Sequence, residues 1–386
     1  AGSIFDAMGY PSEHMNFCYE NGGEALALTD HGNMNGFSHQ LLHWKKMKAE
    51  GKNFKPIFGV EAYFLPSIEE WRDDYERVKA DAKQAKSLAK QGDTSGATVE
   101  DEDASKKAIK SVINRRRHLV LLVQNQTGLT NLFKLISESY KEENFYRYPR
   151  VDYKMLNKYS EGIVAASACL GGPYAGNYWA NREEGPEAVR EAMRETTRRF
   201  VEIFGDRWHG ELQWNNIPEQ HELNQYIIEM SKEFGIPLIS TADSHYPNPD
   251  AWRDRELYKR LGWLGKGAPA WAEDNTELPP GGEEIGYELY PKNGNQMWDS
   301  YKYYSKSCGV EYDDQLVMDS ITRTHDIAFN MIEDFTPDTT VKLPNFVVPA
   351  GFTADQALVN YSLEGLRNLN FHDNKEYTDR LQTELD

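Results

Sequence analysis

Four short apolar segments in this chain run directly into side chains that can bind a metal ion. The segments and the side chains that follow them are 25–28 with Asp30 and His31, 56–60 with Glu61, 162–167 with Cys169, and 236–241 with Asp243 and His245. Apolar runs of this length, ended by glycine or polar residues, are typical of buried β-strands. We therefore expect four buried strands that each finish in a potential ligand.

Ligands at the ends of parallel strands converge, because strand ends of one polarity share one rim of a closed barrel. Between Ala25 and His245, apolar runs alternate with segments of helical pattern, which predicts an α/β barrel. His118 opens the apolar run 118–123 and does not end it, so this argument leaves its role undecided.

Size and charge narrow the possible functions. The chain has 386 residues, of which 39% are hydrophobic, so it can bury a full core. Its formal charge of -18 argues against a surface that holds nucleic acid by phosphate neutralisation alone. If DNA is a partner, another part of the assembly is expected to supply the basic groove.

Cysteine content and hydropathy predict a cytoplasmic protein. Cys18, Cys169 and Cys308 are too few and too widely spaced for a disulfide framework or a Cys-x-x-Cys zinc site. We find neither a run of eighteen apolar residues nor a charged leader followed by an apolar run. We therefore expect no membrane span and no signal peptide.

Residues 67–117 differ in composition from the barrel and predict a charged helical insertion on the surface. Residues 80–90 and 103–114 read as two charged helices with little apolar stripe to bury. The basic cluster 115–117 closes the insertion. Contact with phosphate is one interpretation of this cluster, and a solvated helix end is the favoured one.

The run 144–150 interleaves Phe145, Tyr146 and Tyr148 with Arg147 and Arg150. Aromatic rings alternating with arginine suit stacking on nucleotide bases. Ordinary loop packing is the alternative.

The part after residue 250 predicts an extension of the barrel followed by a separate segment. We expect residues 251–342 to form helices and a Pro-rich and Gly-rich loop at 269–286, with a packed helix over 314–332. Residues 343–349 read as a linker, and Thr353 with Gln356 forms a capping box for a last long helix.

Asp, Glu, His and Cys side chains on one rim suit two or three zinc or manganese ions. Two such ions roughly 3.5 to 4 Å apart can bind both the attacking hydroxide and the leaving oxygen of a phosphate ester. Phosphoester hydrolysis is therefore the reaction that these residue types favour.

Several of these segments together resemble the polymerase and histidinol phosphatase (PHP) domain, in the version found at the N-terminus of the bacterial replicative DNA polymerase III alpha subunit. The segments that carry the resemblance are 26–33, 58–63, 118–128 with Leu132 and Ile136, 167–171 and 236–246. The insertion and the run 145–150 suggest a phage or viral relative. The resemblance implies a distorted seven-stranded β/α barrel, similar to a TIM barrel, with a multinuclear metal site.

Carried over position by position, the resemblance implies the ligand set Asp6, His31, Glu61, His118, Cys169, Asp243 and His245. This set includes His118, whose role the strand argument left undecided. The family begins with a strand that carries a His-x-His pair, and that strand would precede Asp6. We expect it to be missing from residues 1–386, so that two expected ligands are absent. The 386-residue chain is then expected to bind metal weakly and to show little nuclease activity.

The resemblance also implies domains and partners. Residues 1–250 correspond to the PHP barrel, 251–342 to its extension, and 343–386 to a linker and the start of the polymerase palm. The implied function is DNA replication, with 3′-5′ exonuclease activity at the barrel; the polymerase site with its magnesium ions would lie beyond residue 386. DNA, other replisome subunits and the remainder of the polymerase chain, including an upstream His-x-His segment, are the implied partners. An inert scaffold and a free-standing small-molecule phosphatase are the alternatives.

Overall fold

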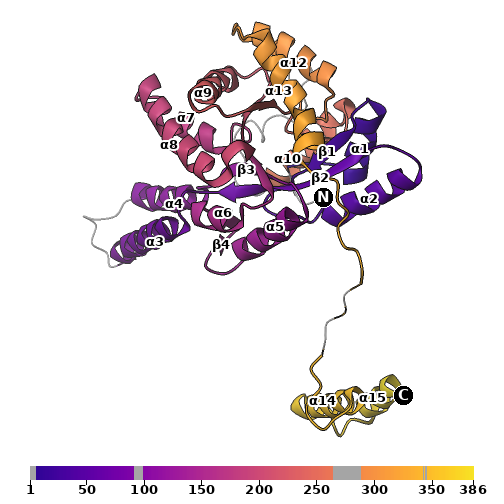
Figure 1. The fold of residues 1–386 in the computed structure, drawn as a ribbon. Coiled ribbons are helices and arrows are strands. Elements are labelled where there is room, and N and C mark those ends of the chain that lie inside the picture. Colours follow the sequence, from indigo (N-terminus) through magenta and orange to yellow (C-terminus); the bar gives the residue numbers. More distant parts are fainter. Residues whose placement is uncertain (1–5, 91–98, 264–287, 342, 344–345) are drawn as a thin grey trace. The chain divides into compact units, whose positions relative to one another are not determined.

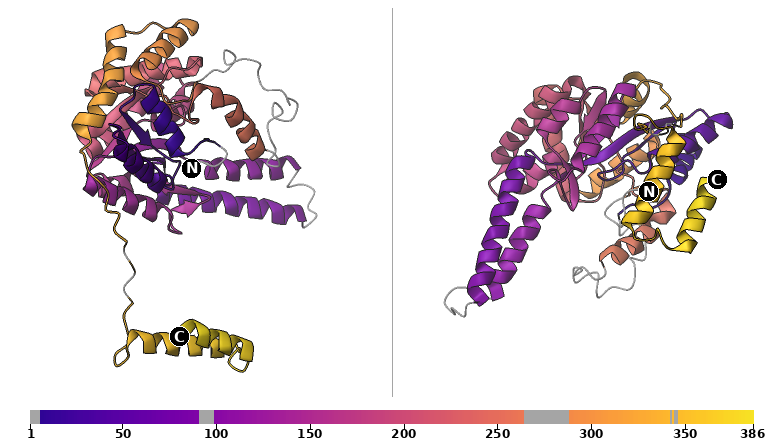
Figure 2. Two further views of the ribbon diagram at one scale, coloured as in Figure 1. Left: turned by 90° about the vertical axis from the view of Figure 1, so that its right-hand side faces the viewer. Right: turned by 90° about the horizontal axis from the view of Figure 1, so that it is seen from below.

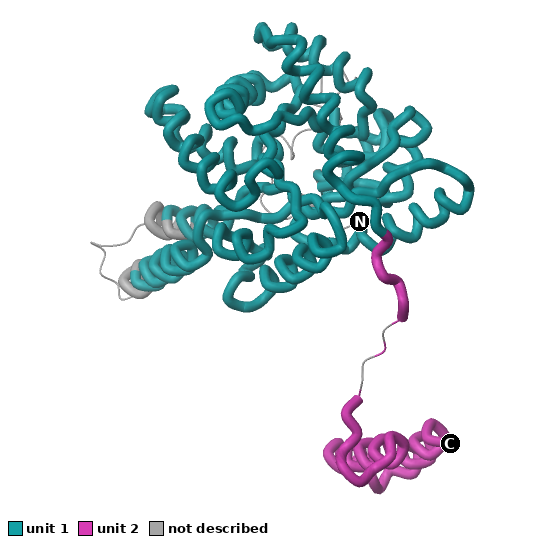
Figure 3. The backbone as a smooth tube through the Cα atoms, in the orientation of Figure 1, with its two compact units in different colours: residues 1–335 teal, residues 336–386 magenta. Residues whose placement is uncertain are grey.

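A computed structural model describes residues 6–90, 99–263, 288–341, 343 and 346–386 (Figure 1). The expected first strand would lie at or before residues 1–5, and the expected loop at 269–286 lies within 264–287, so both fall outside the described residues. The chain forms two compact units, residues 1–335 and 336–386, which are coloured separately in Figure 3.

The first unit is built on a curled sheet of eight strands. They are β1 (Ala25–Leu28), β2 (Lys55–Phe64), β3 (Arg117–Val123), β4 (Phe145–Tyr146), β5 (Tyr148–Val151), β6 (Ile163–Ala166), β7 (Trp208–Leu212) and β8 (Leu238–Ser240). The strand order is β4-β5-β2-β3-β6-β7-β8, and β1 pairs with the first half of β2. Among the described residues β1 and β8 do not pair, so the sheet is a curled half-barrel. The predicted α/β class with a barrel-like sheet is confirmed.

Strand direction departs from the expected parallel arrangement at β3. The pairs β1 with β2, β6 with β7, and β7 with β8 are parallel. In contrast, β3 runs antiparallel to both of its neighbours, β2 and β6. The start of β3 therefore lies at the rim where the neighbouring strands end.

Side chains alternate between the two faces of each strand. On the outer face, Val60, Leu121 and Ala165 pack toward the surrounding helices in the largest hydrophobic cluster. On the inner face, a smaller apolar cluster fills the bottom of the half-barrel; we call it the floor cluster. It consists of Ile57, Leu122, Val164, Ala166, Ile239, Ile327, Ala328 and Ile332. Nearer the rim, the inner-face positions are polar, as Glu61 on β2 and Glu211 on β7 show, so a polar site can form there.

Helices cover the outer face of the sheet (Figures 1 and 2). Those of the first unit are α1 (Pro11–Glu20), α2 (Phe37–Ala49), α3 (Ile68–Lys90), α4 (Val99–Ile113), α5 (Gln126–Ser139), α6 (Tyr153–Tyr159), α7 (Pro173–Asn181), α8 (Pro186–Phe204), α9 (Pro218–Phe234), α10 (Trp252–Trp263), α12 (Gly294–Ser307) and α13 (Asp314–Asp326). No helix within the described residues is long and apolar enough to cross a membrane.

The insertion at 67–117 is more firmly anchored than its composition predicts. Its first helix, α3, begins at Ile68, twelve residues before the predicted start at Ala80. Trp71 is buried in the core and donates a hydrogen bond from Nε1 to the carbonyl of Val112 at the end of α4 (2.9 Å). The two helices lie side by side and project from the sheet (Figure 2). Where side chains are described, the charged residues of α3 are mostly exposed, but the bases of both helices belong to the core.

The segment that follows α13 closes the bottom of the half-barrel. The predicted packed helix ends in a π-helical turn, η4 (Ile327–Met331), and this turn supplies Ile327 and Ala328 to the floor cluster. The Lys55 ammonium donates to the carbonyl of Ile332 (2.6 Å) and pairs with Asp334 (2.7 Å), so the start of β2 is fastened to this segment.

The second unit contains α14 (Ala354–Asn368) and α15 (Lys375–Leu385). The predicted capping box is confirmed: Thr353 Oγ1 accepts a hydrogen bond from Gln356 N (3.2 Å), and Thr353 N donates to Gln356 Oε1 (2.9 Å). Between Thr336 and Thr353, the described residues form neither helix nor strand.

Candidate metal centre at the rim

All seven predicted ligands lie at one rim of the half-barrel. His31 follows β1, Glu61 lies on the inner face of β2, His118 opens β3, Cys169 follows β6, and Asp243 and His245 follow β8. Asp6 joins them from the segment before α1. The reversed direction of β3 explains why His118 belongs to this group although it begins its strand.

The first group of potential ligands consists of Asp6, His31 and His245, whose donor atoms lie within 4.8 Å of one another. His31 Nδ1 lies 3.3 Å from Asp6 Oδ2, and His245 Nε2 lies 3.7 Å from Asp6 Oδ1. The rings of His31 and His245 are 5.7 Å apart and nearly perpendicular. Two nitrogens and a carboxylate therefore face one small volume.

The second group consists of Glu61, His118 and Cys169, again with donor atoms within 4.8 Å. Glu61 Oε1 lies 2.5 Å from His118 Nδ1, and Cys169 Sγ lies 3.7 Å from the same nitrogen. Glu61 Oε1 is buried, and the contact with His118 is not aligned as a hydrogen bond, so this oxygen lacks a directed donor among the described residues. A nitrogen, a sulfur and a carboxylate oxygen form a set that suits zinc.

His31 connects the two groups. Its Nε2 lies 3.4 Å from Glu61 Oε2, while its Nδ1 faces Asp6. Asp243 lies beside the first group, with Oδ1 3.7 Å from His245 Nδ1. The seven side chains thus form one continuous cluster with two parts, and we call it the rim cluster.

Local backbone contacts fix these positions. Beyond β1, His31 continues the parallel pairing with β2: Gly32 N donates to the carbonyl of Glu61 (2.8 Å) and Glu61 N to the carbonyl of Asp30 (3.1 Å). His118 N donates to the carbonyl of Gly171 (2.9 Å), and Gly171 N donates to Cys169 Sγ (3.4 Å). The sheet register therefore sets which ligands are neighbours.

Asp6 is held by a residue far along the chain. Arg255 on α10 is buried; it donates from Nη2 to Asp6 Oδ1 (2.9 Å) and from Nε to the carbonyl of Asp6 (2.7 Å). Met8 N donates to the carbonyl of His245 (2.7 Å). These contacts attach the N-terminal segment to the rim.

The histidines and carboxylates of the rim cluster shift one another's protonation. Burial opposes a charge on His31, but the carboxylates of Glu61 and Asp6 outweigh it and raise the pKa of His31 to about 9. Burial likewise opposes a charge on His245, whose pKa Asp243 and Asp6 raise. In return, despite burial, the histidines lower the pKa of both Asp6 and Glu61. Protons on His31 and His245 thus offset the negative charge of the carboxylates, as a bound cation would.

Two further acids of the rim stay neutral. Burial, followed by the charges of Asp243 and Glu61, raises the pKa of the Cys169 thiol well above its usual value. Burial raises the pKa of Glu211 to about 8, although Thr241 Oγ1 donates to Glu211 Oε2 (3.0 Å). Glu211 lies on the inner face of β7 and lines a cavity of about 260 Å³. Five members of the rim cluster also line it: His31, Glu61, Cys169, Asp243 and His245.

Glu211 and Arg255 were not predicted as site residues. For Glu211 the sequence gives a signal, since residues 209–214 form a strand candidate with polar residues on its inner face. Arg255 lies on a charged helix remote in sequence from Asp6, and no local pattern links the two. Asp30, a potential ligand by sequence, is instead buried and accepts a hydrogen bond from Gly36 N (2.8 Å).

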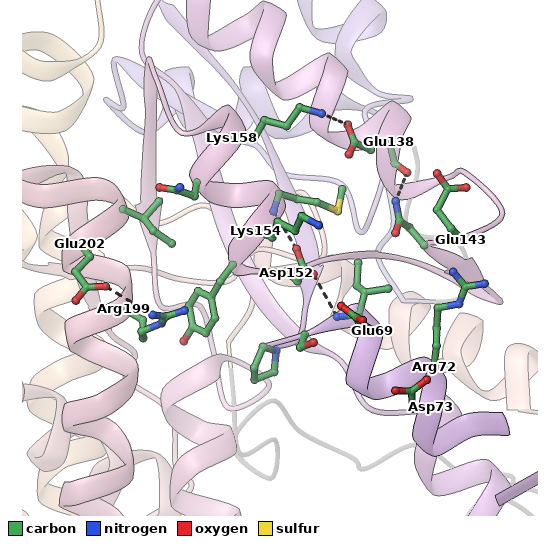
Figure 4. A pocket seen from close by; sticks show the side chains of 18 residues that line it. Glu69, Arg72, Asp73, Glu138, Glu143, Asp152, Lys154, Lys158, Arg199 and Glu202 are labelled. Carbon is green, nitrogen blue, oxygen red and sulfur yellow. Dashed lines mark hydrogen bonds and ion pairs between the residues drawn. The ribbon is translucent and has the colours of Figure 1, made fainter. Parts of the chain in front are cut away.

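A larger cavity, of about 860 Å³, lies outside the sheet and is shown in Figure 4. Neither His nor Cys lines it. Several of its charged side chains already have partners: Lys158 pairs with Glu138 (3.0 Å), and Asp152 accepts hydrogen bonds from the backbone of Ile68 (3.2 Å) and Met155 (2.9 Å). The smaller rim cavity, which is lined by predicted metal ligands, is therefore the candidate site.

Fold and site together define an α/β protein with a two-part centre of histidine, carboxylate and cysteine at the rim of a curled sheet. The chain belongs to the PHP domain family, whose model matches residues 1–214.

Curated relatives extend the likeness over most of the chain. This chain is 33% identical over 372 residues to the DNA polymerase III subunit alpha of Aquifex aeolicus. The match covers 95% of this chain and 27% of the relative. It is 30% identical over 343 residues to the subunit of the same name from Borreliella burgdorferi, covering 89% and 24%. The chain thus spans about a quarter of the length of these relatives.

A solved amidohydrolase from Chromobacterium violaceum aligns with 66% of this chain and 93% of its own, at 14% identity and a TM-score of 0.30. That score is too low to support an argument about this protein.

Proposed function

We propose that this chain is the PHP portion of a replicative DNA polymerase III alpha subunit and that its rim cluster supports 3′-5′ exonuclease hydrolysis of DNA. Similarity to the polymerase subunits over 95% and 89% of the chain supports the first part. The arrangement of His31 supports the second, because this one imidazole faces a carboxylate of each ligand group, at 3.3 Å and 3.4 Å. Adjacent ligand groups of this kind suit a two-metal site.

The residues present fit divalent zinc or manganese. The rim cluster offers imidazole nitrogens, carboxylate oxygens and one thiol, which are the donors that these ions take in proteins. Buried Glu61 Oε1, which has no aligned hydrogen-bond donor among the described residues, is the clearest individual position for a cation. Asp6, His31 and His245 would hold one ion, and Glu61, His118 and Cys169 another; Asp243 would add to the first.

Bound cations at such a site lower the pKa of water and offset negative charge on phosphoryl oxygens. The chain's own residues prepare the site for a diester. Arg255 orients Asp6 through two hydrogen bonds, and Gly171 N donates to Cys169 Sγ (3.4 Å). Glu211 lines the same cavity from the inner face of β7, and its carboxyl group would be available there to exchange a proton with an oxygen of a bound phosphate.

The test compares the 386-residue chain with a version extended upstream by a His-x-His segment. Metal content is measured by mass spectrometry, and hydrolysis is followed on 3′-labelled DNA and on a small phosphodiester. We expect the extended protein to hold two or three ions and to shorten DNA from its 3′ end. The 386-residue chain should bind metal more weakly and cleave slowly.

Two outcomes would count against this proposal, and a third would contradict only the expected low activity of the 386-residue chain. Stoichiometric metal without hydrolysis in the extended protein would make the domain a scaffold that braces the polymerase. Activity on a sugar or amino-alcohol phosphate but not on DNA would make it a small-molecule phosphatase. A full exonuclease rate in residues 1–386 would show that the upstream segment is not needed.

A further inference from the structure

A small hairpin of arginine and aromatic residues borders the rim cluster. β4 (Phe145–Tyr146) pairs antiparallel with β5 (Tyr148–Val151), and Arg147 forms the turn with a left-handed φ of 59°. β5 in turn pairs with the end of β2, where Tyr63 lies opposite Arg150. The hairpin therefore extends the sheet at the strand that carries Glu61.

Direct contacts join the hairpin to the rim cluster. Tyr63 follows Glu61 on the inner face of β2, and its ring lies 6.2 Å from His31 and 5.8 Å from His118. The same ring lies 5.5 Å from Tyr148 of the hairpin. At Gly32, where φ is +66°, a Cβ atom would come within 2.9 Å of Tyr63, so the turn after His31 packs closely against this ring. Tyr63 thus stands between the metal ligands and the hairpin.

Arginine and aromatic groups continue outward from Tyr63. The Arg116 guanidinium lies 3.8 Å from the ring centre of Tyr148 and 5.2 Å from that of Tyr63. Arg147 is exposed at the turn and lies 5.9 Å from the ring of Tyr146. Phe145, 39% exposed, stacks on Tyr140, 47% exposed, with ring centres 5.5 Å apart. Exposed rings beside cationic groups are what unpaired bases and their phosphates bind.

Arg150, which the sequence groups with these residues, has a different role. It is fully buried, lies 3.9 Å over the ring of Trp71, and donates to the carbonyls of Tyr146 and Tyr148 (2.9 and 3.0 Å). It therefore holds the hairpin in shape, while Arg147 is exposed and Arg116 is half-buried.

We propose that Tyr140, Phe145, Tyr146, Arg147, Tyr148 and Arg116, here named the hairpin platform, bind single-stranded nucleic acid and lead its 3′ end past Tyr63 to the rim cluster. The direction toward a 3′ end rests on the proposed function; the binding itself does not. With a chain charge of -18, stacking on the rings supplies most of the affinity and two arginines supply the phosphate contacts.

The test is fluorescence anisotropy of a labelled oligo(dT) with the 386-residue chain in a metal chelator, which prevents hydrolysis. Two arginines predict a slope of log K against log salt of about -1.4. Phe145→Ala should weaken binding roughly tenfold through lost stacking. Arg147→Gly, which suits the left-handed turn, should reduce the slope by about 0.7. Tyr303→Ala on α12 and Arg198→Ala on α8 are the matched aromatic and arginine controls.

The outcomes separate this inference from the proposed function. Absence of saturable binding at low salt, or hairpin variants that bind as the two controls do, would overturn the hairpin platform. Circular dichroism identifies any variant that fails to fold, and Arg147→Gly then decides the question without Phe145→Ala. Normal oligonucleotide binding in the chelator, together with no hydrolysis when the upstream-extended protein is supplied with zinc or manganese, would refute the proposed hydrolysis and support the hairpin platform.

Discussion

The imidazole of His31 is the side chain on which both halves of the rim cluster depend. It contacts Asp6 through one nitrogen and Glu61 through the other. Without His31, the group formed with Asp6 and His245 loses a potential ligand, and the group around Glu61 loses its contact with the first group.

We predict that His31→Ala weakens zinc binding by at least about tenfold, as the loss of a ligand or its support does in other metal sites. Isothermal titration calorimetry measures the change. The exposed His39→Ala on α2 is the matched control and should bind as the unchanged protein does. Equal zinc affinity in both variants would remove His31 from the site.

Glu211 gives a prediction for pH. Its pKa rises from the ordinary value of 4.5 to about 8 in the folded protein. The folded state therefore binds more protons than the unfolded state in this range, and this group lowers the free energy of unfolding as the pH rises from 4.5 to 8. The effect is at most about 1.4 kcal/mol per pH unit.

The Glu211→Gln variant has no ionisable group at this position. In metal-free solution, the unfolding free energy of the variant minus that of the unchanged protein should therefore grow with pH and level off above about 8. Urea denaturation at several pH values measures the difference. Glu202→Gln, an exposed change on α8, is the matched control for replacing a carboxylate by an amide. A difference for Glu211→Gln that stays flat with pH would mean that its carboxyl group is not desolvated.

Individual site residues were predictable where a local pattern carries them. His31, Glu61, Cys169, Asp243 and His245 follow buried segments, and each can be identified from its own neighbourhood. Asp6 came only from family resemblance, because no apolar run of strand length precedes it in the sequence. Arg255 contacts Asp6 across 249 positions, and such a pairing leaves no trace in either local sequence.

At the scale of elements, apolar runs locate strands but do not give their direction. The reversal of β3 brings His118 to the rim, and only the pairing of β3 with β2 and β6 reveals it. Burial at the base of α3 and α4 was also hidden, because Trp71 and Val112 are too isolated among charged residues to form a visible apolar stripe.

The floor cluster predicts where the barrel is sensitive to truncation. Ile332 is buried at 3% exposure and follows η4. Ile332→Ala should lower the free energy of unfolding by about 2–5 kcal/mol, because it leaves a cavity among well-packed side chains. Urea denaturation measures this loss. Met318→Ala, an exposed change on α13, should stay within about 0.5 kcal/mol of the unchanged protein. Similar losses in both variants would indicate that the floor cluster is loosely packed.

For the whole molecule, the sequence predicts a boundary after residue 342, and contacts divide the chain between Phe335 and Thr336. Helical periodicity and the capping box identify α14 from local sequence alone. The exact end of the first unit depends on Phe335, which packs against the core and has no local mark of a boundary.

We predict that limited proteolysis cuts between Thr336 and Thr353, where the described residues form neither helix nor strand. The fragment that ends in this segment should keep the melting temperature of the first unit, as measured by circular dichroism. A fall of several degrees would show that residues 336–386 contribute to the stability of the first unit.

The attachment of Asp6 to Arg255 has a consequence for how the protein is made. A ribosome releases Arg255 some 249 residues after Asp6, so the nascent chain carries this predicted ligand without its arginine partner through most of the synthesis of the barrel. Ile332, which seals the opposite end, emerges later still. Vectorial folding can build the early strands and helices as they appear, but the rim is completed only after residue 255 has left the exit tunnel, and the floor only after residue 332.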